Sequence, residues 1–372
     1  MKIACNTRLF IPGTLEGVAR FSYEVIKRMV QDHPEDEFIF IHDRKVDDQF
    51  RMGDNVEHVS IGPQARHPLL WYWWFEKSTA KVIHKHKPDV YFSPELYCCL
   101  TSSVPTMTVC HDLAYAHYPE HIPVLERKYL MRFVPRFVQR AQAIGCVSEA
   151  TRIDLLDKTS LSMEKTLLTP NGATPGFHPL NSDRKQEIRN LTTDGHPYFI
   201  YIGSMHPRKN IPNMIRAYDH YRINHPDAHH KLVLVGRFAW KAEDSRKAID
   251  QSRHKDDIII LGERSDASDL VGAADALLYV SLLEGFGIPI LEALAAQVPV
   301  ITSSTSSMPE VAGDAGLIVD PADIEAIARA MRDITSIDIR GKLIANGKKQ
   351  LEKYAWDETA STVYNRLSML AQ

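Results

Sequence analysis

The chain has 372 residues, of which 44% are hydrophobic and 24% are charged, and this is the composition of an ordinary globular protein. A chain of this length favours two domains over one. Lysine and arginine together number 44 against 47 aspartate and glutamate residues, so the formal net charge is −3. That balance argues against a protein that binds nucleic acid through a broad basic surface.

The cysteines and the start of the chain indicate a reducing compartment. The five cysteines have no spacing typical of a zinc site, and Cys5, Cys110 and Cys146 lie in apolar runs that predict buried thiols. Polar residues follow the first five residues at once, which is unlike a signal peptide. No apolar run has the length of a membrane span. We therefore expect a cytoplasmic protein.

Short apolar runs alternate with amphipathic segments through the first half of the chain. Apolar residues recur at helical spacing from Val18 to Met29, so a helix is predicted from about residue 17 to 31. Further helices are predicted to begin at residue 69 and to run from about 124 to 142, and strands are predicted at 2–5, 38–41, 56–61, 88–94, 105–110 and 143–148. Strands that alternate with helices indicate a parallel sheet with crossover helices.

Residues 167–179 are dense in proline and glycine, which is typical of an interdomain linker. A second alternation follows, with strands predicted at 198–203, 232–236, 258–262, 276–280 and 299–304. A last helix is predicted near the end of the chain. We therefore expect three parts, which are a domain of residues 1–175, a domain of residues 176–353, and a C-terminal helix of residues 354–372.

The strand predicted at 276–280 runs into a glycine turn with two acidic neighbours. Glu284 follows the strand, and Gly285 and Gly287 allow a tight turn and close approach of a ligand to the backbone. Glu292 lies about one turn inside the next helix, whose N-terminus favours a phosphate group. The two carboxylates could therefore hold the hydroxyl groups of a sugar while the helix end holds its diphosphate. A solvated Glu284 and a Glu292 favoured by the helix dipole are the alternative, since such units are common.

Other polar groups also fall at the carboxyl ends of predicted strands, where parallel sheets bind ligands. They are Gly203 and Ser204 with Arg208 and Lys209 after one strand, Gly236 with Arg237 after the next, and His111 after the strand at 105–110. Adjacent arginine and lysine offer one forked and one compact cation to a diphosphate, and a solvated loop pair is the alternative. A satisfied structural histidine is the alternative for His111. No residues have the spacing of a metal site.

Taken together, these motifs resemble family 4 of the retaining glycosyltransferases, in which they occur in the same order. The signature of that family, two glutamates separated by seven residues, is written here from Glu284 to Glu292. Residues 203–210 resemble its diphosphate loop, 236–237 its nucleotide-side loop, 311–316 the segment after the signature, and 111–113 with 119–120 its N-terminal active-site loop. The chain departs from the family at Val280, where proline is frequent, and at Ala19, where glycine is frequent.

The resemblance spans nearly the whole chain and implies an α/β protein of the GT-B fold. Two Rossmann-like domains would place their parallel sheets across a cleft, the first binding the acceptor and the second the nucleotide-sugar. The C-terminal helix would pack back toward the first domain. The family moves a sugar from a nucleotide donor to an acceptor hydroxyl, keeps the anomeric configuration and generally needs no metal. No cofactor is therefore expected besides the donor, which is a substrate.

The resemblance also implies roles for individual residues. Arg208 and Lys209 would neutralise the leaving diphosphate, Glu284 would bind hydroxyls of the donor sugar, and His111 would lie near the reacting centre. These four residues are the expected catalytic group, and Glu292 would bind the ribose. The other residues expected to line the donor site are Gly17, Arg20, Gly203, Ser204, Gly236, Arg237, Gly285, Phe286, Gly287 and Ile288.

Resemblance to bacterial surface-polysaccharide enzymes favours GDP-mannose as the donor and a glycan or lipid-linked glycan as the acceptor. Three other functions stay open. The chain could be a sugar-nucleotide epimerase, an inverting transferase on the same architecture, or a nucleotide-sugar-binding protein without catalytic activity.

Two basic stripes lie in the first domain, near the aromatic residues 71–75. They consist of Lys77, Lys81 and Lys85, and of Lys128, Arg132, Arg136 and Arg140. We expect them to bring the protein into peripheral contact with an anionic membrane, at the inner face of the plasma membrane. Two ordinary amphipathic helices with solvated faces are the alternative.

Overall fold

The computed structural model describes residues 1–13 and 15–372, and Thr14, in the loop before the first predicted helix, lies outside the described residues. The chain divides into two units. The first unit is Met1–Asn171 together with Trp356–Gln372, and the second unit is Gly172–Ala355. The first unit thus ends four residues before the expected boundary at 175, and Thr174, in the second unit, donates a hydrogen bond to Glu292.

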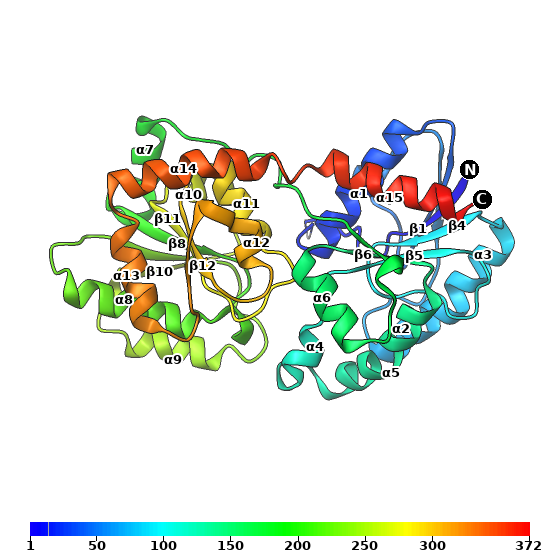
Figure 1. Cartoon of the computed structure of the whole chain (residues 1–372), viewed down its shortest axis with the longest axis horizontal. Coiled ribbons are helices and arrows are strands. Elements are labelled where there is room, and N and C mark those ends of the chain that lie inside the picture. The colour runs from blue at the N-terminus through cyan, green and yellow to red at the C-terminus, as the bar shows by residue number, and fades with distance from the viewer. Residues whose placement is uncertain (14) are drawn as a thin grey trace. The chain divides into compact units, whose positions relative to one another are not determined.

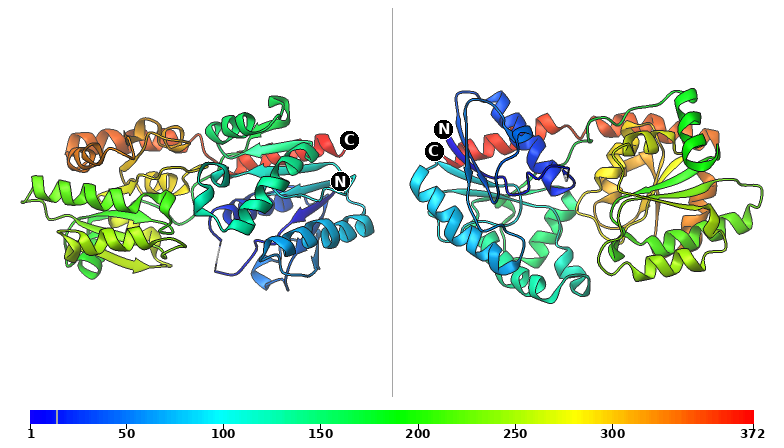
Figure 2. Two further views of the ribbon diagram at one scale, coloured as in Figure 1. Left: turned by 90° about the horizontal axis from the view of Figure 1, so that it is seen from below. Right: turned by 180° about the vertical axis from the view of Figure 1, so that it is seen from behind.

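A parallel sheet forms the centre of the first unit (Figures 1 and 2). Within the described residues its strands are β1 (Lys2–Asn6), β2 (Glu37–His42), β3 (Val56–Ser60), β4 (Val90–Ser93), β5 (Thr106–Cys110), β6 (Ala143–Cys146) and β7 (Thr166–Leu168). They lie in the order β3-β2-β1-β4-β5-β6-β7, so the order reverses between β1 and β4. The linker predicted at 167–179 starts too early, because Leu167 and Leu168 pair with β6. The prolines and glycines nearby indicated a linker, whereas the pairing with β6 is a tertiary contact that local composition does not predict.

Helices cover this sheet. They are α1 (Val18–Asp32), α2 (Pro68–Trp73), α3 (Ala80–His86), α4 (Ala114–His117), α5 (Val124–Arg140), α6 (Glu149–Lys158) and α15 (Trp356–Leu370), and a π-helical segment, Trp74–Thr79, joins α2 to α3. The helical spacing of the sequence located α1 and α5 to within two residues. α1 buries Phe21, Val25 and Met29 on one side, as an amphipathic helix against a sheet should.

A second parallel sheet forms the centre of the second unit, all of whose residues are described. Its strands are β8 (Tyr198–Ile202), β9 (Lys231–Val235), β10 (Ile258–Gly262), β11 (Ala276–Tyr279), β12 (Val300–Ser303) and β13 (Gly316–Val319), in the order β10-β9-β8-β11-β12-β13. The helices are α7 (Ser182–Thr193), α8 (Ile211–Asn224), α9 (Glu243–Gln251), α10 (Ala267–Ala273), α11 (Ile288–Ala295), α12 (Met308–Ala312), α13 (Ile324–Asp333) and α14 (Ile337–Leu351). The prediction of two Rossmann-like α/β domains is confirmed.

The C-terminal helix α15 belongs to the first unit, where it packs along α1 (Figure 1). The ring of Trp356 meets Phe21 edge-on at 6.1 Å, and His33 stacks on Tyr364 with ring centroids 3.3 Å apart. Asp357 accepts a hydrogen bond from the guanidinium of Arg28. The helix therefore completes the first unit from the far end of the chain. Every helix among the described residues is too short or too polar to cross a lipid bilayer.

Two histidines contact each other on neighbouring strands, the buried His42 at the end of β2 and the half-buried His58 on β3. His42 is 2% exposed, its Nδ1 lies 3.2 Å from the Thr7 hydroxyl, and its Nε2 lies 3.1 Å from Nδ1 of His58. Burial, and then the neighbouring His58, lower the pKa of His42 from 6.5 to about 4. Burial also lowers the pKa of His58. Both rings therefore stay neutral in the folded protein at physiological pH.

This pair makes the stability of the chain depend on pH. An unfolded chain takes up a proton at His42 near pH 6.5, whereas the folded chain resists it until about pH 4. The free energy of unfolding should thus fall, by up to about 3 kcal/mol from this group, as the pH drops through that window. Urea denaturation at pH 7 and pH 4.5 measures the effect. The fall should be smaller in His42→Asn but not in His84→Asn, which changes an exposed histidine. Equal pH dependence in all three proteins would contradict it.

Candidate active site

The predicted strand–turn–helix unit is formed by β11, the loop 280–287 and α11. β11 is fully buried, and Gly287 begins α11 with a φ of 102°, a left-handed conformation that favours glycine. A Cβ atom there would also lie 3.1 Å from Cδ1 of Ile290. The loop leaves the sheet where the strand order reverses between β8 and β11, which is where open parallel sheets bind their ligands.

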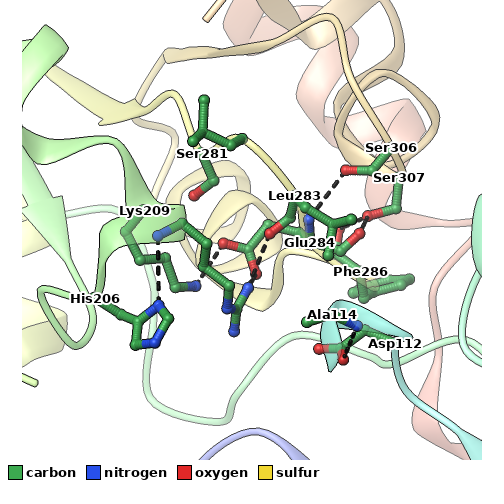
Figure 3. Close-up of polar contacts among 12 residues, drawn as sticks. Asp112, Ala114, His206, Lys209, Ser281, Leu283, Glu284, Phe286, Ser306 and Ser307 are labelled. Carbon is green, nitrogen blue, oxygen red and sulfur yellow. Dashed lines mark hydrogen bonds and ion pairs between the residues drawn. The ribbon is translucent and has the colours of Figure 1, made fainter. Parts of the chain in front are cut away.

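Glu284 is the centre of this loop and is held by three side chains. Its Oε2 accepts a hydrogen bond from Nη1 of Arg208 at 2.8 Å, and its Oε1 accepts one from Nζ of Lys209 at 2.5 Å. The hydroxyl of Tyr279 donates to the same Oε1 at 3.0 Å. Figure 3 shows Lys209 and the Glu284 carboxylate pointing toward each other, with Ser306 bonded to the Glu284 backbone. We call Arg208, Lys209, Tyr279 and Glu284 the carboxylate cluster.

The charges in the cluster are strongly coupled because Glu284 is only 7% exposed. Burial alone would raise the pKa of the Glu284 carboxyl group, but the positive charges of Arg208 and Lys209 outweigh it and lower the pKa to about 2. Glu284 is therefore ionised at any physiological pH. Two cations therefore face this one carboxylate at the edge of the sheet.

The two cations are fixed by the backbone of the loop after β8. Asn210 takes a left-handed conformation, with a φ of 61°, and its Nδ2 donates to the carbonyl oxygens of Val280 at 3.0 Å and Pro321 at 2.8 Å. The N–H of Leu282 donates to the carbonyl of Arg208 at 2.8 Å. These bonds tie the loop after β8 to the loop after β11, so Arg208 and Lys209 are brought to Glu284, a contact that the sequence did not predict.

Tyr279 is a member of the cluster that sequence reasoning missed. Its buried hydroxyl accepts a hydrogen bond from Nζ of Lys209 at 2.8 Å while it donates to Glu284. Its ring lies nearly parallel to that of Tyr201 at 6.1 Å, and the Tyr201 hydroxyl donates to the carbonyl of Ser204 at 2.9 Å. The signal in the sequence was a single tyrosine at the end of an otherwise aliphatic strand.

Gly203 and Gly236 lie at the ends of the neighbouring strands β8 and β9. Both have a φ of 133°, and a Cβ atom on Gly236 would lie 2.0 Å from the carbonyl oxygen of Gly203. The two glycines therefore allow two loops to leave the sheet side by side. Arg237, in contrast, is directed to solvent, with 75% of its side chain exposed and Nε 3.4 Å from Glu263. It is not part of the carboxylate cluster.

Glu292 lies in the first turns of α11 and is 9% exposed. Its carboxylate accepts a hydrogen bond from the Thr174 hydroxyl, so it is a satisfied buried group rather than a solvated one. Phe286 is also buried and meets the ring of Tyr354 edge-on at 5.4 Å. Gly285 lies in the turn between Glu284 and α11, and Ile288 is the first residue of α11.

The remaining predicted site residues belong to the first unit. A ring nitrogen of His111, Nε2, lies 2.8 Å from the carbonyl oxygen of Pro94, and Phe21 meets the ring edge-on at 5.0 Å. Burial lowers the pKa of His111, so the ring is neutral. Gly17 begins α1 with a φ of 51°, and Arg20, one turn later, lies 3.3 Å from Glu24.

Comparison with known families gives a match in each unit. A family model described as Glycosyltransferase Family 4 matches residues 15–176, and one described as Glycosyl transferases group 1 matches residues 183–350. O-antigen chain mannosyltransferase B of Escherichia coli is 26% identical over 96% of this chain and 97% of its own length. O-antigen chain mannosyltransferase RfbU of Salmonella typhimurium is 26% identical over 81% of this chain and 80% of its own.

Solved structures match over both units. Anabaena Alr3699/HepE in complex with UDP and glucose is 17% identical, with a TM-score of 0.77 over 99% of each chain. WaaG, a glycosyltransferase involved in lipopolysaccharide biosynthesis, is 16% identical, with a TM-score of 0.75 over 99% of each chain. The GT-B fold implied by the sequence motifs is therefore confirmed.

The close approach of Gly203 and Gly236 gives a test of the site's backbone. Gly236→Ala should lower the free energy of unfolding by about 3 kcal/mol, because its Cβ meets a neighbouring backbone oxygen. Gly262→Ala, at a φ of 66° with open space around the Cβ, should lower it by only about 1 kcal/mol. Urea denaturation of the two variants measures the difference. Equal losses would mean that the backbone at Gly203 moves away freely.

Proposed function

We propose that this chain, which belongs to family 4 of the retaining glycosyltransferases, transfers mannose from GDP-mannose to a hydroxyl group of a glycan or lipid-linked glycan. Both family matches and the GT-B fold support a nucleotide-sugar glycosyltransferase. The choice of mannose rests on the relatives, two of which are named O-antigen chain mannosyltransferases. Such a role places the protein in the synthesis of a surface polysaccharide.

The carboxylate cluster is the observation that carries the proposal. Transfer of the sugar leaves negative charge on the departing diphosphate, and fixed cations stabilise charge that develops in a transition state. Arg208 and Lys209 are held in place before the donor arrives, and their charge exceeds that of Glu284. In our proposal the diphosphate pairs with Arg208 and Lys209, and Glu284 is then available to accept hydrogen bonds from sugar hydroxyls.

We propose further contacts between the donor and the residues around the carboxylate cluster. The N-terminus of α11 and the turn of Gly285, Phe286 and Gly287 offer backbone N–H groups to phosphate or sugar. Glu292 binds the ribose by exchanging its present partner, the Thr174 hydroxyl. The nucleotide is contacted by Gly203, Ser204, Gly236 and Arg237. The first unit contributes His111, Gly17 and Arg20 to donor binding.

A panel of nucleotide-sugars tests this function. The true donor should raise the melting temperature of the protein by mass action and should slowly release free nucleotide. An epimerase would instead return an altered sugar on an intact nucleotide, and a non-catalytic binder would be stabilised without turnover. Stabilisation by GDP-mannose together with release of GDP supports the proposal, and a different donor with the same behaviour would overturn only the choice of mannose.

Two variants test the residues of the cluster. Glu284→Ala and Lys209→Ala should each lower kcat/KM for transfer by at least about 100-fold, because each removes a group that stabilises the transition state. The folded state should persist in both, as checked by circular dichroism. Glu187→Ala and Lys247→Ala change exposed residues of the same types in the same unit and should retain activity. Wild-type turnover by Glu284→Ala or Lys209→Ala would remove the role assigned to that residue.

We also propose that the first unit contacts an anionic membrane, at the inner face of the plasma membrane, through α2 and α5. These helices pack together, and the rings of Tyr72 and Phe133 lie 5.6 Å apart. The exposed apolar residues on them, which we call the α2/α5 face, are Leu69, Leu70, Tyr72, Trp73, Val124, Leu125 and Met131. Leu69 is 68% exposed and Trp73 is 56% exposed, which is unusual for side chains of this size.

Basic side chains outnumber acidic ones around the α2/α5 face, where Glu126 is a half-buried acid on α5. Lys77, Lys128, Arg132 and Arg136 are exposed. The carboxylate of Glu76 is buried and accepts hydrogen bonds from the N–H groups of Leu100 and Thr101. Arg140, which was predicted to extend the basic stripe, instead donates to the carbonyl oxygens of Ser102 and Val104. Exposed apolar side chains with positive charges beside them are typical of a surface that binds anionic lipid.

Co-sedimentation with lipid vesicles tests this contact. The protein should pellet with vesicles that contain phosphatidylglycerol and not with pure phosphatidylcholine, since each basic residue near an anionic surface adds about 1 kcal/mol of attraction. Trp73→Ser and the double variant Lys128→Glu, Arg132→Glu should both weaken pelleting. Lys158→Glu on α6 is the control for charge reversal. Binding that ignores anionic lipid and all these changes would contradict the proposal.

A further inference from the structure

His111 has a defined tautomer because of the group that it contacts. Its Nε2 lies 2.8 Å from the carbonyl oxygen of Pro94, and a carbonyl oxygen only accepts hydrogen bonds. The hydrogen must therefore be on Nε2. Because burial lowers the pKa of this histidine, the ring carries a single hydrogen and Nδ1 keeps its lone pair.

The direction of the Pro94 carbonyl is set by the next residue, Glu95, since both belong to one planar peptide group. The Glu95 carboxylate is buried and clamped at the end of β1. Its Oε1 accepts hydrogen bonds from Nδ2 of Asn6 at 2.6 Å and from Nε of Arg8 at 2.5 Å, and its Oε2 accepts one from Nη2 of Arg8. Residue 95 is therefore held by its side chain, and the peptide group before it is held with it.

The Arg8 side chain of the clamp is itself held by further contacts. The Arg8 guanidinium lies 5.8 Å from the ring centroid of Phe75 and 5.5 Å from that of Tyr97, and its Nη1 donates to the carbonyl of Ala65 at 3.4 Å. These contacts fix the forked side chain in one plane, as bidentate arginine–carboxylate pairs require. The clamp lies at the ends of β1 and β4, where the strand order of the first sheet reverses.

We propose that Glu95, clamped by Asn6 and Arg8, is a positioning residue that keeps His111 in the Nε2–H tautomer, so that Nδ1 accepts a hydrogen bond from a substrate hydroxyl. This inference rests on the proposed function, which supplies the sugar substrate. In the other tautomer, a lone pair on Nε2 would face the lone pairs of the Pro94 carbonyl. The ring would then present N–H to the substrate, and the hydroxyl would lose its acceptor.

The tautomer is measured directly by ¹⁵N NMR of protein labelled at histidine, with His111→Gln to assign the ring. In the wild-type protein at pH 8 the two ring nitrogens of His111 should give separate signals, a protonated Nε2 and an unprotonated Nδ1. In Glu95→Gln the amide no longer pairs with the Arg8 charge, so the two signals should move toward each other. A wild-type ring protonated at Nδ1 would overturn the proposal, even if the variant failed to fold.

Kinetics give a second readout. Glu95→Gln should lower kcat roughly tenfold, which corresponds to one hydrogen bond to the substrate, while the melting-temperature shift caused by the donor nucleotide persists. Glu76→Gln removes another buried carboxylate of the first unit and is the matched control, because its partners are Leu100 and Thr101. Equal kcat losses and unchanged His111 signals in both variants would mean that Glu95 has only a structural role.

The experiments distinguish a failure of the proposed function from a failure of the positioning role of Glu95. If no nucleotide-sugar is turned over by the wild-type protein, the proposed function fails, yet the His111 spectrum still decides whether the clamp sets the tautomer. If transfer occurs and Glu95→Gln leaves both spectrum and kcat unchanged, only the positioning role fails.

Discussion

The ion pairs between Glu284 and the cations Arg208 and Lys209 hold together two loops that leave the second sheet from different strands. A buried cation without a counterion is strongly unfavourable, so these loops stay together whether or not a ligand is present. Asn210 adds uncharged hydrogen bonds to the same junction. If the donor binds as we propose, its diphosphate would compete with a carboxylate already in place. Donor binding would then be an exchange of anionic partners, which would limit the affinity for any single phosphate and favour a ligand that also supplies hydroxyls for the displaced carboxylate.

The same arrangement recurs in the first unit with a different charge. Each sheet reverses its strand order once, between β1 and β4 or between β8 and β11, and a carboxylate clamped by an arginine lies at each reversal. In the second unit two cations face Glu284, whereas in the first unit Arg8 and Glu95 balance each other. An excess of positive charge suits an anionic donor. A neutral, fully bonded pair suits a place where geometry rather than charge has to be controlled.

Much of this architecture could be predicted from the sequence because it depends on local pattern. Apolar runs located the strands except β7 and β13, helical spacing located α1 and α5, and the glycines at 285 and 287 located the turn before α11. The cluster was predicted only in part: Arg208, Lys209 and Glu284 were expected at one site, while Tyr279 was not. Asn6, Arg8 and Glu95 were also missed. Their contacts join residues almost ninety positions apart, and no spacing in a single sequence reports such a pairing. The hydrogen bond from Thr174 to Glu292 likewise joins residues more than a hundred positions apart.

The position of α15 has a consequence for how the chain can be divided. Because Trp356–Gln372 completes the first unit, the second unit is an inserted domain, entered after Asn171 and left at Ala355. The second unit is thus one contiguous fragment, but the first is not. A fragment that stops at Asn171 lacks the helix that covers Phe21 and stacks on His33, so its apolar face would be open to water. A circular permutant that joins the C-terminal helix directly to Met1 would make the first unit one contiguous stretch of chain.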